Sequence, residues 1–215
     1  MEFDVARLSV AERYKLLIGG IVPRPIALVS TVSADGDPNV APFSFFNGIG
    51  SDPMTMLFCP GNKDDGSEKD TLRNAKPTEE GGTGEFVVNL AVETYARKVA
   101  AAAEPLDYGE SEFGLTGLTP SSSTVVAAPR VAESPLCFEC RTIQVVRTNP
   151  GRPGAGNIVI GRVVHVFVRD DLVNDRMHVE ASSEASGAGS RSSSSFRRST
   201  RCGRATSAVS SRSLR

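Results

Sequence analysis

The order of hydrophobic and polar positions predicts a body made mainly of short β-strands. Six segments combine β-branched or aromatic residues with turn signals on either side; they are residues 26–33, 40–46, 54–59, 85–91, 136–148 and 157–169. Breaks at 34–38 and 149–156, which contain glycine and proline, join neighbouring strands. Antiparallel strands with few helices predict a closed or nearly closed β-barrel with peripheral helices, rather than a doubly wound sheet.

Three segments have the features of helices. Ser9 and Glu12 have the spacing of a capping box, apolar residues follow at roughly helical intervals, and a glycine pair at 19–20 ends the pattern. Residues 70–74 and the alanine-rich segment 93–103 are the other predicted helices. The stretch between 104 and 135 is predicted to be a long connection, and a connection of that length in a compact domain is usually functional or acts as a lid.

Composition separates the last part of the chain from the rest. Residues 181–215 contain 13 serines and seven arginines but one acid, Glu184. Such a segment buries too little apolar surface to offset its chain entropy, so we predict a folded domain over 1–180 and a disordered Ser/Arg-rich tail over 181–215. The tail is interpreted as a solvated segment without a role, as a basic arm for RNA or an acidic partner, or as the product of a frameshift in GC-rich DNA.

Charge and apolar patterning exclude several classes of protein. Residues 1–180 carry a net charge of −7, which is unfavourable for nucleic-acid binding. No apolar run approaches the ~18 residues of a membrane-spanning helix, and the N-terminus lacks the pattern of a secretory signal. Cysteines without an evident pairing then indicate a reducing cytoplasm. Cys137 and Cys140 lie on one predicted strand and point to opposite faces, which argues against a metal or redox pair.

The familiar catalytic motifs are absent. The chain has no nucleophile elbow, no His-Glu-x-x-His pattern, no Walker A loop and no dinucleotide fingerprint. His165 alternates with apolar residues, as expected for a half-buried histidine on a strand. We therefore predict neither a catalytic acid or base nor a metal site.

Three short segments have the chemistry of an anion and ring site. Lys69, Asp70 and Thr71 begin a predicted helix and offer a charge, a hydroxyl and free backbone N–H groups to a phosphate. Plain helix capping beside a solvated lysine is the alternative. Arg24 lies between two prolines, so its guanidinium is stiffly held, although an ordinary surface arginine would have the same sequence.

The third segment is residues 42–47, Pro-Phe-Ser-Phe-Phe-Asn. Strand alternation would send Phe43 and Phe45 to one face and Ser44 and Phe46 to the other. A hydroxyl, an amide and an aromatic ring near a strand end can border a flat polar ring. A core strand with polar end residues is the alternative interpretation.

Taken in order, these segments resemble the flavin reductase-like, FMN-binding split-barrel family, nearest the flavoredoxin type. The matching segments run through roughly residues 10–180 and are 22–31, 39–47, 51–53, 69–71, 86–90, 139–141 and 160–165. The resemblance implies a split β-barrel that forms a homodimer and holds FMN noncovalently near the dimer interface. The cofactor-binding residues it implies are Arg24, Ser30, Thr31, Ser44, Phe45, Phe46, Asn47, Lys69, Asp70, Thr71 and Asn89.

The resemblance also implies an activity, in which electrons pass from NAD(P)H through FMN to free flavin or to a protein acceptor. The acceptor would be an oxygenase if reduced FMN is released, or a redox protein if FMN is retained. A noncatalytic FMN-binding module is the alternative function. The family usually continues after the 177–178 region into a glycine-rich ending, and the Ser/Arg-rich tail in its place gives further support to the frameshift hypothesis.

Overall fold

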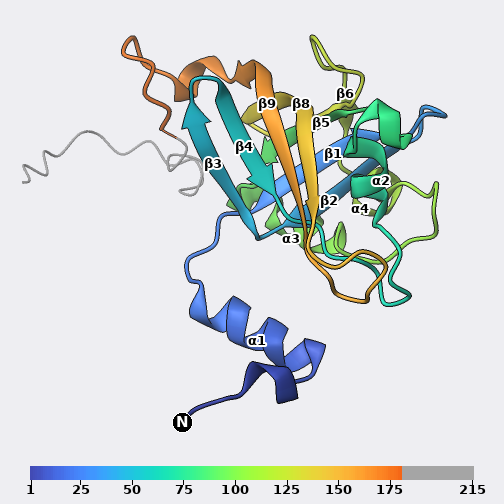
Figure 1. The fold of residues 1–215 in the computed structure, drawn as a ribbon. Helices are drawn as coiled ribbons and strands as arrows, with labels where there is room; N and C mark the ends of the chain where they lie inside the picture. Colours follow the sequence, from blue (N-terminus) through green and yellow to red (C-terminus); the bar gives the residue numbers. More distant parts are fainter. Residues whose placement is uncertain (181–215) are drawn as a thin grey trace, which may run out of the picture.

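A computed structural model describes residues 1–180 of the chain, and the predictions about the 181–215 tail lie outside the described residues. The described chain is built around one sheet of seven antiparallel strands in the order β2-β1-β5-β8-β9-β4-β3 (Figure 1). The strands are β1 (Ala27–Val32), β2 (Pro38–Phe43), β3 (Phe46–Ser51), β4 (Met54–Phe58), β5 (Glu85–Leu90), β8 (Leu136–Arg147) and β9 (Asn157–Val168). The short strands β6 (Pro120–Ser121) and β7 (Arg130–Val131) pair separately.

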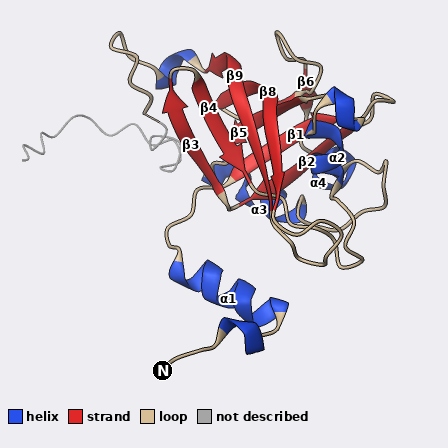
Figure 2. Ribbon diagram, in the orientation of Figure 1, coloured by secondary structure: helices blue, strands red, loops and turns tan. Residues whose placement is uncertain are grey.

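Short helices surround the sheet, so the predicted mainly β architecture with peripheral helices is confirmed (Figure 2). They are α1 (Val10–Gly20), α2 (Asp70–Ala75), α3 (Ala96–Ala101) and α4 (Glu112–Thr116), with 3-10 turns η1 (Val5–Arg7), η2 (Thr78–Glu80), η3 (Glu93–Tyr95) and η4 (Asp170–Leu172). The predicted capping box is present, because the Ser9 hydroxyl accepts from Glu12 N and the Glu12 carboxylate accepts from Ser9 N. Within residues 1–180, none of the helices has the length and apolar character needed to cross a membrane.

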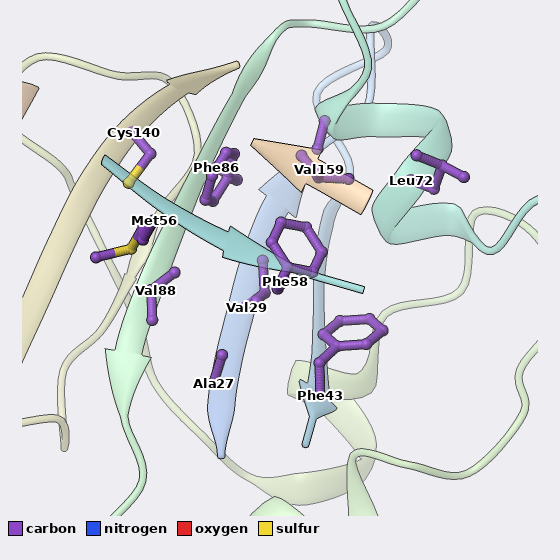
Figure 3. Close-up of a cluster of buried hydrophobic side chains, with 11 residues drawn as sticks. Ala27, Val29, Phe43, Met56, Phe58, Leu72, Phe86, Val88, Cys140 and Val159 are labelled. Atoms are coloured by element: carbon purple, nitrogen blue, oxygen red, sulfur yellow. The ribbon is translucent and has the colours of Figure 1, made fainter. Parts of the chain in front are cut away.

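The sheet curls on itself around an apolar core (Figure 3). The Phe58 ring of β4 lies 5.1 Å from both the Phe43 ring of β2 and the Phe86 ring of β5, so strands far apart in the sheet order meet inside the curl. Leu72 and Ala75 of α2 join this cluster and cover one opening of the curl. Burying this many large apolar side chains is the main source of stability in such a fold.

A second apolar cluster lies on the opposite face of β1 and β2. Leu28 and Val40 pack there against Val99 of α3 and Phe113 of α4. Adjacent residues of one strand therefore serve different clusters: Leu28 faces the helices and Val29 faces the core of the curl. Both faces of β1 are buried, which explains its nearly continuous apolar sequence.

The predicted strand over 40–46 is wrong at its end. β2 ends at Phe43, the chain bends at Ser44 and Phe45, and the unpredicted strand β3 begins at Phe46. Cys59 N donates to Phe45 O at 2.9 Å, and this bond holds the bend against the end of β4. Two glycines in β3, with a register shift between Gly48 and Gly50, remove the alternating pattern that would have indicated a strand.

The predicted long connection over 104–135 contains the short elements α4, β6 and β7. The predicted helix over 93–103 is divided into η3 and α3. Cys137 and Cys140 are buried in different apolar clusters, which confirms that they face opposite ways. Burial raises the pKa of both thiols, so neither is suited to redox chemistry.

Gly161 of β9 is a position where the core leaves no room for a side chain. A Cβ atom there would lie 2.3 Å from Phe86 Cζ and 3.3 Å from Cys140 Cβ, and Phe86 is fully buried. Gly161→Ala is therefore expected to destabilise the fold by about 1–3 kcal/mol through overpacking. Urea unfolding would measure this, with Gly48→Ala as the control, because a Cβ at Gly48 meets nothing within 4 Å. Equal effects of the two substitutions would contradict the packing argument.

Candidate functional site

A cavity of about 400 Å³ lies beside the start of α2. Its walls come from β2, from the 62–64 loop, from α2 and from the segment that follows α3. Lys69, Asp70 and Thr71, the three residues predicted from the helix start, all line it. Lys63 and Glu112 line it as well, and neither was predicted as a site residue.

The charges around this cavity leave one lysine available to a ligand. Lys63 Nζ lies 3.2 Å from Asp70 Oδ1, so these two charges largely satisfy each other. Lys69 is exposed, and its side chain neither caps α2 nor forms an ion pair with any residue between 1 and 180. A cation without a carboxylate partner at the edge of a cavity is suited to a phosphate.

A buried polar network holds α2 against the sheet beneath this cavity. Asn74 Nδ2 of α2 donates to Thr31 Oγ1 of β1 at 3.1 Å, and an amide atom of Asn39 lies 3.0 Å from Thr71 Oγ1. All four side chains are buried. The network fixes Lys69 and Thr71 relative to β1 and β2, and Thr31 acts in it beneath the cavity rather than in its wall.

Glu112 places a carboxyl group in the same cavity from α4. It is buried, and its Oε2 accepts a hydrogen bond from Val40 N at 3.1 Å. Burial raises the pKa of Glu112 above its ordinary value, and the Asp70 carboxylate adds to this rise. The Glu112 carboxyl therefore holds a proton more readily than an exposed glutamate would.

The raised pKa of Glu112 predicts a pH-dependent effect of Glu112→Gln. Folding is favoured while the carboxyl is protonated, and that contribution is lost as the pH rises through the pKa of the folded state. Glutamine keeps an acceptor for Val40 N without the charge, so the variant is expected to gain Tm relative to the wild type, by a few degrees, from pH 4.5 to 7.5. Scanning calorimetry at several pH values would measure the difference. A difference independent of pH would contradict this.

Arg24 and the 44–47 segment form a second group of predicted residues. The Arg24 guanidinium donates to Ser44 Oγ at 3.3 Å and to Ile21 O at 2.7 Å, and it also donates to Ile18 O. It therefore fastens the end of α1 to the bend between β2 and β3. Phe45 meets the Tyr14 ring of α1 edge to face, while Phe46 and Asn47 begin β3. Arg24 does not line the cavity beside Lys69.

This anchoring role of Arg24 predicts a local effect of Arg24→Ala. The substitution leaves the last carbonyl groups of α1 without their charged donor, which is expected to speed amide hydrogen exchange in α1 about tenfold. Arg13→Ala, on the same helix, is the matched control, because within residues 1–180 the Arg13 guanidinium donates to the neighbouring Ser9 O alone. If amide hydrogen exchange in α1 rises equally in Arg24→Ala and Arg13→Ala, the anchoring role of Arg24 is contradicted.

Ser30 and Asn89 form a third group that faces away from the cavity. Asn89 Nδ2 donates to Leu28 O and to Ser30 Oγ, each at 3.0 Å, and Asn89 Oδ1 accepts from Val131 N at 2.8 Å. Ser30 Oγ donates to Pro129 O. Both side chains are fully buried, so their polar atoms tie the 129–131 segment to β1 and β5. Ser30 and Thr31 are neighbours on β1 and point to opposite faces of the strand, so the structure does not bring them to one ligand. Flavin contact by Ser30 or Asn89 stays a prediction.

An apolar cavity of about 450 Å³ adjoins the charged one. Ile26, Val92 and Val99 line it together with alanines of α3, and Pro42 lies in the walls of both cavities. Apart from the small side chains of the alanine-rich segment, no sequence pattern indicated this second cavity. A charged cavity next to an apolar one suits a ligand that carries a phosphate at one end and a flat ring at the other.

Comparison with known proteins agrees with this geometry. The family model described as the flavin reductase like domain matches residues 19–182. An uncharacterised protein of Halalkalibacterium halodurans is 42% identical over 176 residues, which cover 81% of this chain and 82% of the relative.

Two solved structures have a similar fold. Nitrilotriacetate monooxygenase component B from Bacillus cereus has a TM-score of 0.77 at 33% identity, covering 85% of this chain and 88% of that one. The 2-nitrobenzoate 2-nitroreductase of Pseudomonas fluorescens has a TM-score of 0.71 at 27% identity, and the match covers 83% of this chain and 82% of that one.

These similarities confirm the split-barrel fold and support a flavin oxidoreductase function. The residues present also fit a flavin nucleotide, since Lys69, which has no ion-pair partner among residues 1–180, lines a polar cavity that shares Pro42 with an apolar one. The family match covers most of the chain and includes every strand of the main sheet. The chain belongs to the flavin reductase-like family.

Proposed function

We propose that this chain binds FMN and passes electrons from NAD(P)H to free flavin or to a protein acceptor. The observation that carries the proposal is the position of Lys69, a cation without an ion-pair partner among residues 1–180, at the edge of a cavity that adjoins an apolar one. Lys69 and Thr71 would hold the FMN phosphate, and the ring would extend past Pro42 toward the 44–47 segment. When bound, the flavin supplies the chemistry of accepting a hydride and passing on electrons.

The chain's own residues position the ligand in this proposal. The buried network of Thr31, Asn39, Thr71 and Asn74 fixes α2, and with it Lys69, against the sheet. The Arg24 hydrogen bonds hold the bend that carries Ser44 and Phe45. Rigid mounting of both ends lowers the entropy lost when a long ligand is bound.

We also propose a homodimer located in the cytoplasm. α1 has no buried residue, and Tyr14, Leu17 and Ile21 on and beside it are each about half exposed. Figure 1 shows α1 lying apart from the sheet, so a second copy would cover this apolar surface. Free thiols at Cys59, Cys137 and Cys140 suit a reducing compartment. Sedimentation analysis tests the dimer, and a monomer at micromolar concentration would contradict it.

An absorption spectrum of the purified protein, taken before and after addition of FMN and then NADH, tests the activity. Flavin that stays with the protein through gel filtration and is bleached by NADH would identify a carrier that serves a redox protein. A colourless protein that oxidises NADH only with added FMN would identify a reductase that supplies an oxygenase. FMN binding without turnover by either NADH or NADPH would leave a noncatalytic binding module.

A further inference from the structure

We propose that the hollow between α2, the 81–83 turn and Tyr108 binds the phosphate-bearing adenosine of a dinucleotide. Two ligands share this chemistry: the adenylate half of FAD and the 2′-phosphorylated adenosine of NADPH. The inference rests on the proposed flavin function, because it places the hollow next to the phosphate end of the flavin cavity. It concerns different residues from those that would hold FMN.

The hollow is polar and positively charged. It measures about 150 Å³, and Arg73 and Lys76 line it without any carboxylate. Lys76 is partly neutralised by Glu68 at 3.2 Å. Arg73 forms no ion pair with the residues of the 1–180 range, so its full charge faces the hollow. A guanidinium free of carboxylate partners is the usual group for binding a phosphate.

An aromatic ring supplies the second feature of a nucleotide site. The Arg73 guanidinium lies 4.5 Å from the centre of the Tyr108 ring, and Tyr108 is 56% exposed. Stacked guanidinium and phenol groups form a flat surface on which a purine base can stack. No core packing accounts for the exposed ring, because Tyr108 belongs to none of the buried clusters.

The hollow lies near the flavin cavity, because a small space shares wall residues with both. A small space of about 20 Å³ shares Asn39 and Asp70 with the cavity beside Lys69, and it shares Asn74 and Tyr108 with the cationic hollow. Ser33, Asp37 and Glu110 also line this space, and carboxylates are the groups that accept hydrogen bonds from ribose hydroxyls.

The residues along this side of α2 match the chemistry of a nucleotide. Asp70 lines the small space, Arg73 lines the hollow, and Tyr108 lines both. One helical turn, about 6 Å, separates Lys69 from Arg73, and a ribose phosphate can bridge that distance. The hollow thus presents Arg73 for a phosphate and the exposed Tyr108 ring for adenine, with acceptors for ribose beside them.

Calorimetric titration with 5′-AMP and 2′-AMP tests the site without any flavin present. The wild type is expected to bind at least one of them, and Arg73→Ala and Tyr108→Ala are expected to weaken that binding about tenfold or more. Arg97→Ala is the matched control, because Arg97 is an exposed arginine of α3 that lines none of these cavities. Absence of AMP binding, or equal affinity in all four proteins, would overturn the proposal.

Titration of the same proteins with FMN, FAD, NADH and NADPH identifies the ligand. A loss of FAD affinity with FMN unchanged would assign the hollow to the adenylate of FAD. A rise in the KM for NADPH with NADH unchanged would assign it to the 2′-phosphate. If Arg73→Ala weakens FMN and AMP equally, the hollow is part of the FMN phosphate site and the inference fails. A wild type that binds AMP but not FMN would instead refute the proposed function alone.

Discussion

Lys69→Ala is expected to weaken FMN binding by roughly 10- to 150-fold and to leave riboflavin affinity nearly unchanged. A hydrogen bond between a charged donor and a phosphate contributes about 1.5–3 kcal/mol, and each 1.4 kcal/mol is about a factor of ten in affinity. Riboflavin has the same ring and ribityl chain as FMN but no phosphate, so the lysine has nothing to contact in that ligand. Fluorescence titration with both flavins measures the two affinities on one protein.

The choice of Lys69 depends on its electrostatic surroundings. Lys63 lies in the same cavity but is bound to Asp70, so Lys63→Ala removes a charge that is already neutralised and frees a carboxylate near the ligand. Lys98 pairs with Glu133 away from the cavity, and Lys98→Ala is the control for a general loss of positive charge. Equal weakening of FMN and riboflavin by Lys69→Ala would show that the phosphate binds elsewhere.

Raising the salt concentration should have a smaller effect on the variant than on the wild type. Salt screens the attraction between an exposed lysine and a phosphate, and Lys69 is exposed. Lys69→Ala lacks that attraction, so its FMN affinity should depend less on salt concentration. The pair of salt titrations therefore separates a direct charge effect from a distortion of α2.

The structure brings the residues predicted for the phosphate together more fully than those predicted for the ring. Lys69, Asp70 and Thr71 are adjacent in the chain, and a helix start brings neighbours to one cavity without help from distant strands. Arg24 was predicted from its stiff backbone and from the family resemblance, and the structure shows its guanidinium bound to Ser44 and to carbonyl groups at the end of α1. Stiffness predicted that the side chain is held, but not which group holds it.

Other features that the sequence could not predict come from contacts between residues distant in sequence. Ser30 and Asn89 bind each other and the 129–131 segment, about a hundred residues from Ser30, so no local pattern could show that their polar atoms are occupied. β3 was missed because pairing with β4 stabilises a glycine-rich strand of low intrinsic propensity. His165 lies on β9 with its side chain 37% exposed, as its alternation with apolar residues predicted.

In the sequence, Glu139 stands out only as part of the 139–141 segment that resembles the flavin reductase-like family. In the structure, its contacts predict a large effect on stability. It lies on β8 with no exposed surface, and its Oε1 and Oε2 accept hydrogen bonds from Thr124 N at 2.8 Å and Val125 N at 2.7 Å. His165 Nδ1 lies 3.4 Å from Oε1. This buried carboxylate therefore ties the 124–125 part of the long connection to the sheet.

Glu139→Ala is expected to destabilise the protein by about 2–4 kcal/mol, because it leaves two backbone N–H groups without acceptors and opens space in the sheet. For a chain of this size that corresponds to a fall in Tm of roughly 10 °C. The stability of Glu139→Gln should lie between those of the wild type and Glu139→Ala, because the one carbonyl oxygen of glutamine can replace only one of the two acceptors. Scanning calorimetry and urea unfolding measure both variants.

Glu85→Ala is the matched control for this prediction. Glu85 also binds the same connection, through Ala127 N at 2.7 Å, and pairs with Arg141 at 3.3 Å, but it is partly exposed and water can replace both contacts. Its loss is expected to cost about 1 kcal/mol or less. If Glu85→Ala and Glu139→Ala destabilise equally, burial of the Glu139 carboxylate is not what fixes the connection, and the surface pair with Arg141 contributes as much as the buried hydrogen bonds.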